Sequence, residues 1–118
     1  MTDKTMIPTE QLKNLVLSIL EEMQGIDIRI LPVAHLTTIA DYMVIVTGRS
    51  DRHIRSMAEE LAQQVKSQGG QIHGIEGMST AEWVLIDAGD VLVHIMRPDA
   101  RVFYDLDRLW NFDVLEQA

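Results

Sequence analysis

The turn Gly48-Arg49-Ser50 is the first place in this chain where residue types and spacing could support chemistry. It joins an apolar run to a helical segment. Backbone amides at a helix N-terminus can bind an anion such as a phosphate, and Arg49, Arg52 and His53 could assist. A single glycine, however, makes neither a Walker loop nor a dinucleotide-binding motif. The pattern favours a capped turn beside a solvated basic cluster.

The same turn resembles a loop of nucleotidyltransferases, in which a Gly-Ser pair precedes a helix and the next strand supplies two metal-binding carboxylates. Here the next strand reads Gln71-Ile72-His73-Gly74-Ile75 and carries no carboxylate pair. Two-metal phosphoryl transfer would therefore lack its ligands. The chain has no cysteine, and its histidines lack the His-x-x-x-His spacing that is typical of zinc sites. We predict no enzymatic activity, no cofactor and no metal site.

A second group of polar and aromatic residues lies in a predicted hairpin. Asp87 and Asp90 flank a turn and could be an acid/base pair, but the pattern favours solvent-exposed turn residues. Trp83 shares a strand face with Asp87, which favours a partly exposed binding anchor over a core position. His94 shares a face with Leu92 in the next strand. A core or edge histidine and an interface residue are both open interpretations.

The elements that position these residues follow from the spacing of apolar side chains. Residues 10–23 and 54–65 have the 3.6-residue period of helices, residues 26–30 alternate as a strand, and residues 42–46 suit a central strand. A short strand at 71–75 and the hairpin precede a third helix that opens at Pro98. The predicted order is α-β-β-α-β-β-β-α. We therefore expect an α+β fold, an α/β sandwich whose mixed sheet of about five strands is flanked by helices.

The third helix is expected to place a broad apolar face toward the sheet. That face comprises Val102, Phe103, Leu106, Leu109 and Trp110. Leu109 and Trp110 in particular should hold the helix in place. We expect a single domain over residues 1–118, with its core at about 10–110 and a variable tail at 111–118.

Charge and composition narrow the classes of partner. The formal net charge is −8, which disfavours direct nucleic-acid binding because phosphates require a basic footprint. An acidic surface attracts a basic protein and speeds the encounter, although acidity for solubility alone is an open alternative. No apolar run approaches the ~18 residues of a membrane span. The polar start is no signal peptide, so we expect a cytoplasmic protein without membrane contact.

Several segments, in order and with their spacing, resemble the ribosomal silencing factor family, RsfS, also called Iojap. The resemblance runs from about Glu10 to Trp110. The segments are Asp41-Tyr42-Met43-Val44-Ile45-Val46-Thr47-Gly48, Ser50-x-x-His53-Ile54, Ile75-Glu76-Gly77, Ala81-Glu82-Trp83-Val84-Leu85-Ile86-Asp87-x-Gly89-Asp90-Val91-x-Val93-His94 and Arg101-x-Phe103-Tyr104-Asp105-Leu106-Asp107-Arg108-Leu109-Trp110.

The resemblance implies a nucleotidyltransferase-like fold without catalytic carboxylates. It also implies a repressor of translation that binds large ribosomal subunit protein fourteen. Occupying that protein would block association of the large and small subunits under nutrient limitation or in stationary phase. A degenerate nucleotidyl-transfer enzyme and a dimeric scaffold are the alternatives, and the free protein could be a homodimer.

We expect the partner to dock on the hairpin and the third helix. Aromatic and aliphatic side chains would serve as desolvated anchors, and carboxylates would meet basic side chains at the rim. The expected contact residues are Trp83, Asp87, Asp90, Val91, His94, Tyr104, Asp105, Leu106 and Arg108.

Overall fold

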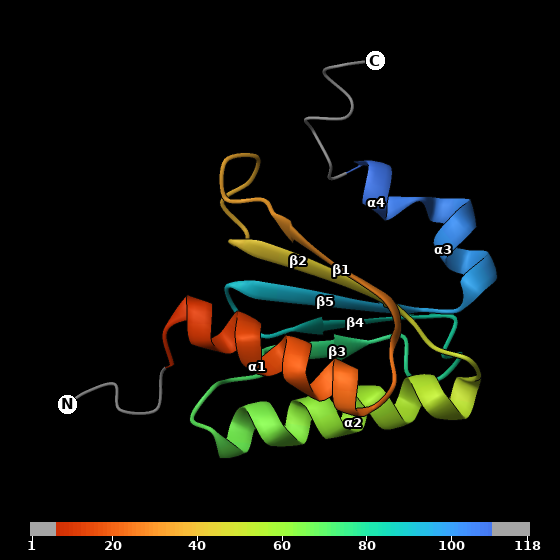
Figure 1. The fold of residues 1–118 in the computed structure, drawn as a ribbon, viewed down its shortest axis with the longest axis horizontal. Coiled ribbons are helices and arrows are strands. Elements are labelled where there is room, and N and C mark those ends of the chain that lie inside the picture. Colours follow the sequence, from red (N-terminus) through yellow and green to blue (C-terminus); the bar gives the residue numbers. More distant parts are fainter. Residues whose placement is uncertain (1–6, 110–118) are drawn as a thin grey trace.

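The computed structural model describes residues 7–109, which form helices and a single mixed sheet (Figure 1). The elements follow the predicted order, except that the last helix is divided in two. They are α1 (Thr9–Glu22), β1 (Ile26–Pro32), β2 (Tyr42–Thr47), α2 (Asp51–Ser67), β3 (Gly74–Glu76), β4 (Trp83–Asp87), β5 (Val91–Met96), α3 (Pro98–Tyr104) and α4 (Leu106–Leu109). None of the helices at positions 7–109 is long and apolar enough to cross a membrane.

The five strands lie in the order β1-β2-β5-β4-β3. Only β2 and β5 pair in parallel, and the other neighbours are antiparallel. The predicted α+β fold with a mixed five-stranded sheet is therefore confirmed. The β4–β5 hairpin lies beside β2 in the centre of the sheet, so β2 has a strand on either side. Its side chains from Met43 to Thr47 are all buried, as the apolar run without alternation predicted.

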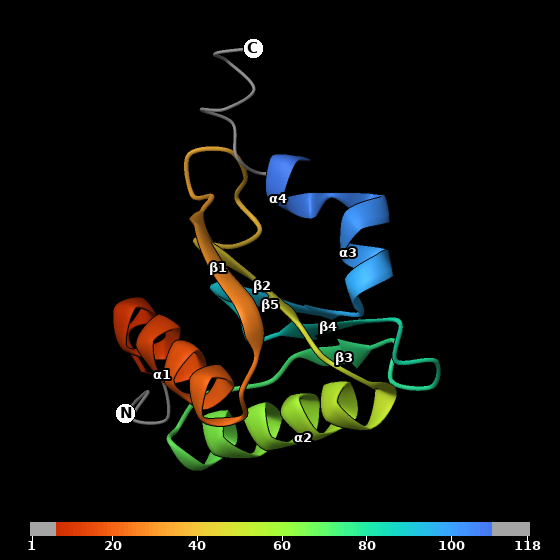
Figure 2. The ribbon, with the colours of Figure 1, turned by 45° about the vertical axis from the view of Figure 1, so that its right-hand side comes forward.

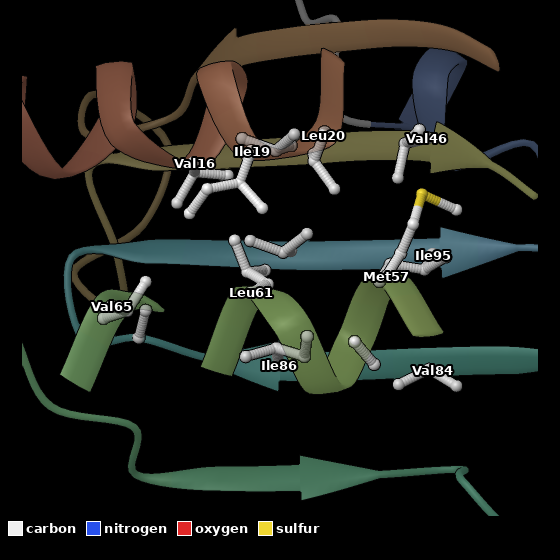
Figure 3. Packing of buried hydrophobic residues seen from close by; sticks show 14 of the residues in the cluster. Val16, Ile19, Leu20, Val46, Met57, Leu61, Val65, Val84, Ile86 and Ile95 are labelled. Atoms are coloured by element: carbon white, nitrogen blue, oxygen red, sulfur yellow. The ribbon is translucent and has the colours of Figure 1, made fainter. Parts of the chain in front are cut away.

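One face of the sheet is fully covered by α1 and α2 (Figure 2). Figure 3 shows how side chains of the two helices meet alternate strand residues. Leu61 of α2 and Leu20 of α1 are both inaccessible to solvent, as is Ile95 of β5. Each helix packs one apolar stripe against the same sheet face, which explains why apolar residues recur in both helices with a 3.6-residue period.

The opposite face is covered only in part, by α3 and α4. Ala100 and Leu106 pack there against Met43, Ile45 and Met96 of the two central strands. Beyond them, on β4 and β3, no helix of the described chain covers the sheet (Figure 2). We call this side, which faces away from α1 and α2, the open face.

The predicted apolar face of the third helix is wrong in part. Asp105 adopts a left-handed conformation, with φ 50° and ψ 51°, and ends α3 after Tyr104. The chain turns there, so Leu106 is buried while Val102 and Phe103 are about four-fifths exposed, at 80% and 78%. Leu109 is 59% exposed and does not hold the helix against the sheet. Trp110 and the tail at 111–118 lie outside the described residues.

Arg101 is the polar side chain that attaches α3 and α4 to the strands. Its Nη1 donates to the Asp27 carbonyl oxygen at 2.6 Å and to Thr47 Oγ1 at 3.0 Å. Its Nε and Nη2 donate to both carboxylate oxygens of Asp107, at 3.2 and 2.9 Å. Burial alone raises the pKa of Asp107, but the hydrogen bonds and charge of Arg101 outweigh it and leave that pKa lowered. One buried guanidinium thus joins β1, β2, α3 and α4.

Candidate protein-docking surface

The hairpin places the expected contact residues at two separate ends. In the β4–β5 register Trp83 lies opposite Met96, whereas Asp87 lies opposite Leu92. The two ends of β4 are thus about 13 Å apart, at roughly 3.3 Å per residue. The Asp90 carboxylate accepts a hydrogen bond from Thr9 Oγ1 of α1 at 2.9 Å. Asp90 therefore belongs to the α1 end of the molecule, away from Trp83.

Trp83, at the start of β4, is the centre of an aromatic cluster on the open face. Its ring centroid lies 4.7 Å from that of Tyr104 of α3. Tyr104 in turn meets Phe103 edge to face, at 4.9 Å and 88°. Trp83 is half-buried, and Tyr104 is 44% exposed. Aromatic side chains that are held in place yet reach solvent are typical binding anchors.

His94 lies beneath this cluster rather than on the surface. Its side chain is 6% exposed, and its Nδ1 accepts a hydrogen bond from Trp83 Nε1 at 2.9 Å. Burial lowers the pKa of His94 to about 4, since desolvation disfavours the charged imidazolium. His94 is therefore neutral at physiological pH and lies in the layer below the exposed rings.

Two other expected contact residues are also in the core. Val91 is inaccessible to solvent and packs in the cluster formed with α1 and α2, on the far side of the sheet. Leu106 is 7% exposed and packs beneath α4. In this structure both side chains are covered by other residues of the chain, so neither lies on the exposed surface. Val91 lies on the covered face because side chains alternate along β5.

Carboxylates surround the aromatic cluster. A cavity of about 340 Å³ beside Tyr104 is lined by Glu82, Asp99, Ala100, Phe103 and Tyr104. Asp87 and Asp105 add negative charge on the open face and at the α3–α4 junction, and Arg108 is exposed on α4. A cavity lined by both aromatic rings and carboxylates suits a lysine or arginine side chain.

Sequence reasoning missed several residues of this surface. Leu85 and Leu92 are half-buried on the open face, Leu85 midway along β4 and Leu92 opposite Asp87, and Phe103 is exposed beside Tyr104. The alternation of β4 places Leu85 between Trp83 and Asp87 and could have identified it. Phe103 was assigned to the core, because the spacing in α3 alone does not show where the helix ends.

Contacts with α2 and with the Trp83 backbone fix the loop before β4, and so fix the position of Trp83 at the start of that strand. Arg55 of α2 donates to the carbonyl oxygens of Met78 and Ser79, each at 2.8 Å. Gly77 has a φ of +95°, and a Cβ placed on it would lie 2.1 Å from the Trp83 carbonyl oxygen. Only glycine permits this approach, so the loop can pack against the backbone of Trp83.

The Gly48 turn uses its polar groups within the protein. Ser50 Oγ accepts from the backbone N–H of His53 at 3.1 Å, which makes Ser50 the N-cap of α2. His53 is buried; its Nδ1 accepts from the Arg49 backbone N–H, and its Nε2 lies 2.7 Å from the Met23 carbonyl oxygen. Across residues 7–109, the structure has no group of three histidines or carboxylates that could hold a metal ion.

Comparison with known proteins identifies the family. The family model described as "Ribosomal silencing factor during starvation" matches residues 7–118. The ribosomal silencing factor RsfS of Zymomonas mobilis is 44% identical over 110 residues, which are 93% of this chain and 83% of that protein. The RsfS of Chromobacterium violaceum is 39% identical over 102 residues, 86% of this chain and 84% of that protein.

The fold agrees with this match. A crystal structure of a Chromobacterium violaceum protein superposes with a TM-score of 0.86 at 38% identity, covering 88% of this chain and 87% of that one. The resemblance noted in the sequence motifs is therefore confirmed across almost the whole chain. This protein belongs to the ribosomal silencing factor family.

Proposed function

We propose that the protein represses translation by docking its open face on large ribosomal subunit protein fourteen. The bound protein would cover the surface that the small subunit must meet, so that the subunits cannot join when nutrients are short. Membership of the ribosomal silencing factor family supports a role at the ribosome. The proposal places the protein in the cytoplasm and requires no cofactor, because steric blocking needs only an interface of standard size, roughly 800 Å² per partner.

The contact between the tilted rings of Trp83 and Tyr104 is the observation that carries this proposal. The two rings lie at the edge of the part of the sheet that α3 covers, and Leu85 is the next residue on the same face of β4. An aromatic centre with aliphatic neighbours and a polar rim has the composition of a docking site. Asp87, Asp105 and Arg108 would belong to its rim.

The acidic cavity beside Tyr104 supports a basic partner. Glu82 and Asp99 carry charge at its edge, and Phe103 and Tyr104 offer ring faces. A lysine or arginine from the ribosomal protein would meet both a carboxylate and a ring there. The net charge of −8 favours the same class of partner over RNA.

Sedimentation with purified large subunits tests the proposal. The wild-type protein should migrate with free large subunits and should lower the yield of joined ribosomes when small subunits are added. Tyr104→Ala and Trp83→Ala should each weaken binding to protein fourteen by about 2 kcal/mol or more while leaving the protein folded. Tyr104 is the cleaner probe, because Trp83 also hydrogen-bonds His94.

Arg49→Ala and Arg52→Ala are the matched controls. Both side chains are exposed near the N-terminus of α2, which covers the opposite face of the sheet. They should bind as the wild type does. If the arginine variants lose binding and the aromatic variants keep it, the interface lies at α2 and the proposed surface is wrong.

A further inference from the structure

The hydrogen bond between Trp83 and His94 determines which tautomer His94 adopts. The indole Nε1 of Trp83 can only donate, so His94 Nδ1 must accept and carries no proton. A neutral imidazole then bears its single proton on Nε2. The tautomer therefore follows from the chemistry of tryptophan rather than from an arbitrary assignment of hydrogens.

The Nε2 atom of His94 is buried and has no hydrogen-bond partner in the described part of the chain. A buried donor without an acceptor destabilises the fold, whereas an aliphatic side chain would not. The neighbouring core positions Ile45 and Met96 are aliphatic or thioether side chains. A histidine here thus offers the fold little except the acceptor that Trp83 uses.

The hydrogen bond to His94 Nδ1 constrains the orientation of the Trp83 indole. His94 and Trp83 are diagonal neighbours on adjacent strands, and their rings lie 5.8 Å apart at 45°. Tyr104 contacts the Trp83 ring at a tilt, and Phe103 contacts Tyr104 edge to face. The orientation of the buried imidazole is thereby passed to side chains that reach the surface.

We propose that His94 is a positioning residue of the docking surface, which fixes the Trp83 indole and through it the Tyr104 ring before the partner arrives. His94 itself makes no contact with the partner. This inference rests on the proposed function, because it assigns His94 a role at the same surface. Groups that are already ordered lose less conformational freedom on binding, so the bond raises affinity without adding a contact.

Substitutions that separate the acceptor from the ring test this role. His94→Asn keeps an oxygen near the position of Nδ1, whereas His94→Leu removes the acceptor and fills similar space. In NMR spectra of the free protein, the Trp83 indole N–H resonance reports the hydrogen bond. This resonance is assigned as the one that is missing from the spectrum of Trp83→Phe. We expect slow solvent exchange of this proton in the wild type and in His94→Asn, and fast exchange in His94→Leu.

Affinity for protein fourteen should follow the same order. His94→Asn should bind within about threefold of the wild type, and His94→Leu should bind about tenfold more weakly. In the Trp83→Phe background, which lacks the donor, His94→Leu should have no further effect on affinity. A role confined to stability would instead shift the denaturation midpoint without this dependence on Trp83.

Two results would overturn the inference. One is an unchanged indole resonance and unchanged affinity in His94→Leu. The other is an equal loss of affinity in the Trp83 and Trp83→Phe backgrounds, which would make His94 a contact. If the wild type does not bind protein fourteen at all, the proposed function fails, and the indole exchange rates in the free protein still decide whether His94 positions Trp83.

Discussion

At the scale of single residues, the two buried histidines differ in how their nitrogens are used. His53 pairs both ring nitrogens with backbone groups of Arg49 and Met23, and so joins the start of α2 to the end of α1. His94 pairs one nitrogen with Trp83 and leaves the other without a partner in the described chain. The hydrogen bonds of His53 explain its presence by the fold alone. The presence of His94 is better explained by the position it gives to Trp83 on the surface above it.

The buried state of His94 should make stability depend on pH. Its pKa is lowered from the ordinary value of 6.5 to about 4 in the folded protein, so the unfolded chain binds the proton more readily. Its contribution is complete above pH 6.5 and is lost progressively as the pH falls toward 4. Between pH 7 and pH 5 the free energy of unfolding should fall by about 2 kcal/mol from this group.

Chemical denaturation at both pH values measures this difference. His94→Asn cannot titrate and should lose about 2 kcal/mol less than the wild type between pH 7 and pH 5. The comparison cancels the other titrating groups, which both proteins share. Equal losses in the two proteins would show that His94 does not remain neutral and buried at pH 5.

At the scale of elements, the docking surface depends on how α3, α4 and the loop before β4 attach to the sheet. Arg101 attaches the two short helices, and Gly77 and Arg55 hold the loop. None of these contacts involves the side chain of Trp83 or Tyr104. Each determines where Trp83 or Tyr104 lies, so changes there should affect docking through geometry.

Gly77→Ala should destabilise the protein by more than about 2 kcal/mol. Its φ of +95° is unfavourable for alanine, and the added methyl group would lie 2.1 Å from the Trp83 carbonyl oxygen. Gly74→Ala is the matched control on β3, because a Cβ there meets no atom within 4 Å. The control should be neutral or stabilise by up to about 1 kcal/mol in urea denaturation. Similar midpoints for both variants would contradict the proposed packing of the loop.

Arg101→Lys should loosen α3 and α4. Lysine keeps the charge but cannot donate to both Asp107 oxygens together with Asp27 and Thr47, so we expect a loss of about 2 kcal/mol. Hydrogen exchange should accelerate in α3 and α4 before the sheet is affected. Arg97→Lys is the control: its guanidinium is 37% exposed and pairs with Asp51 and Asp99 only at 3.6 and 3.5 Å. It should change stability by less than about 0.5 kcal/mol.

At the scale of the whole molecule, the two faces of the sheet differ in how far they are covered. The face under α1 and α2 contains the larger core, and the open face carries the half-exposed aromatic and acidic residues. The chain as a whole carries a formal net charge of −8. Charge of one sign guides a diffusing partner from a distance, whereas the aromatic cluster acts only after contact.

Association with protein fourteen should therefore slow as salt rises. The Debye length shrinks from ~10 Å at 0.1 M to ~3 Å at 1 M, and the association rate should fall by about tenfold across that range. Stopped-flow measurement of the rate constant tests this. The dissociation rate should change far less, because it depends on the desolvated anchors.

Charge-neutral variants locate the part of the charge that matters. Glu82→Gln with Asp99→Asn removes two charges beside Tyr104 and should flatten the salt dependence. Glu21→Gln with Glu22→Gln removes the same number from α1, which covers the opposite face, and should have a smaller effect. If both pairs have equal effects, the overall charge steers docking and the cavity has no special part in it.

Much of the fold followed from local sequence patterns. The periodic spacing in α1 and α2, the unbroken apolar run of β2 and the alternation of the hairpin each predicted an element that the structure contains. Such patterns are local because a side chain's direction depends on its own backbone geometry. The motifs also identified the family before any contact was known.

Tertiary structure alone decided which parts of those elements are surface. The alternation of β5 predicts that Val91 and His94 lie on opposite faces of the sheet. That both are buried while Trp83 stays partly exposed depends on where α1, α2 and α3 pack. The left-handed Asp105 reverses the expected burial of Phe103 and Leu109. Burial depends on residues far away in sequence, since a strand or helix face is covered only where another element packs on it. The sequence therefore determined the elements and the family, and packing determined which side chains form the candidate docking surface.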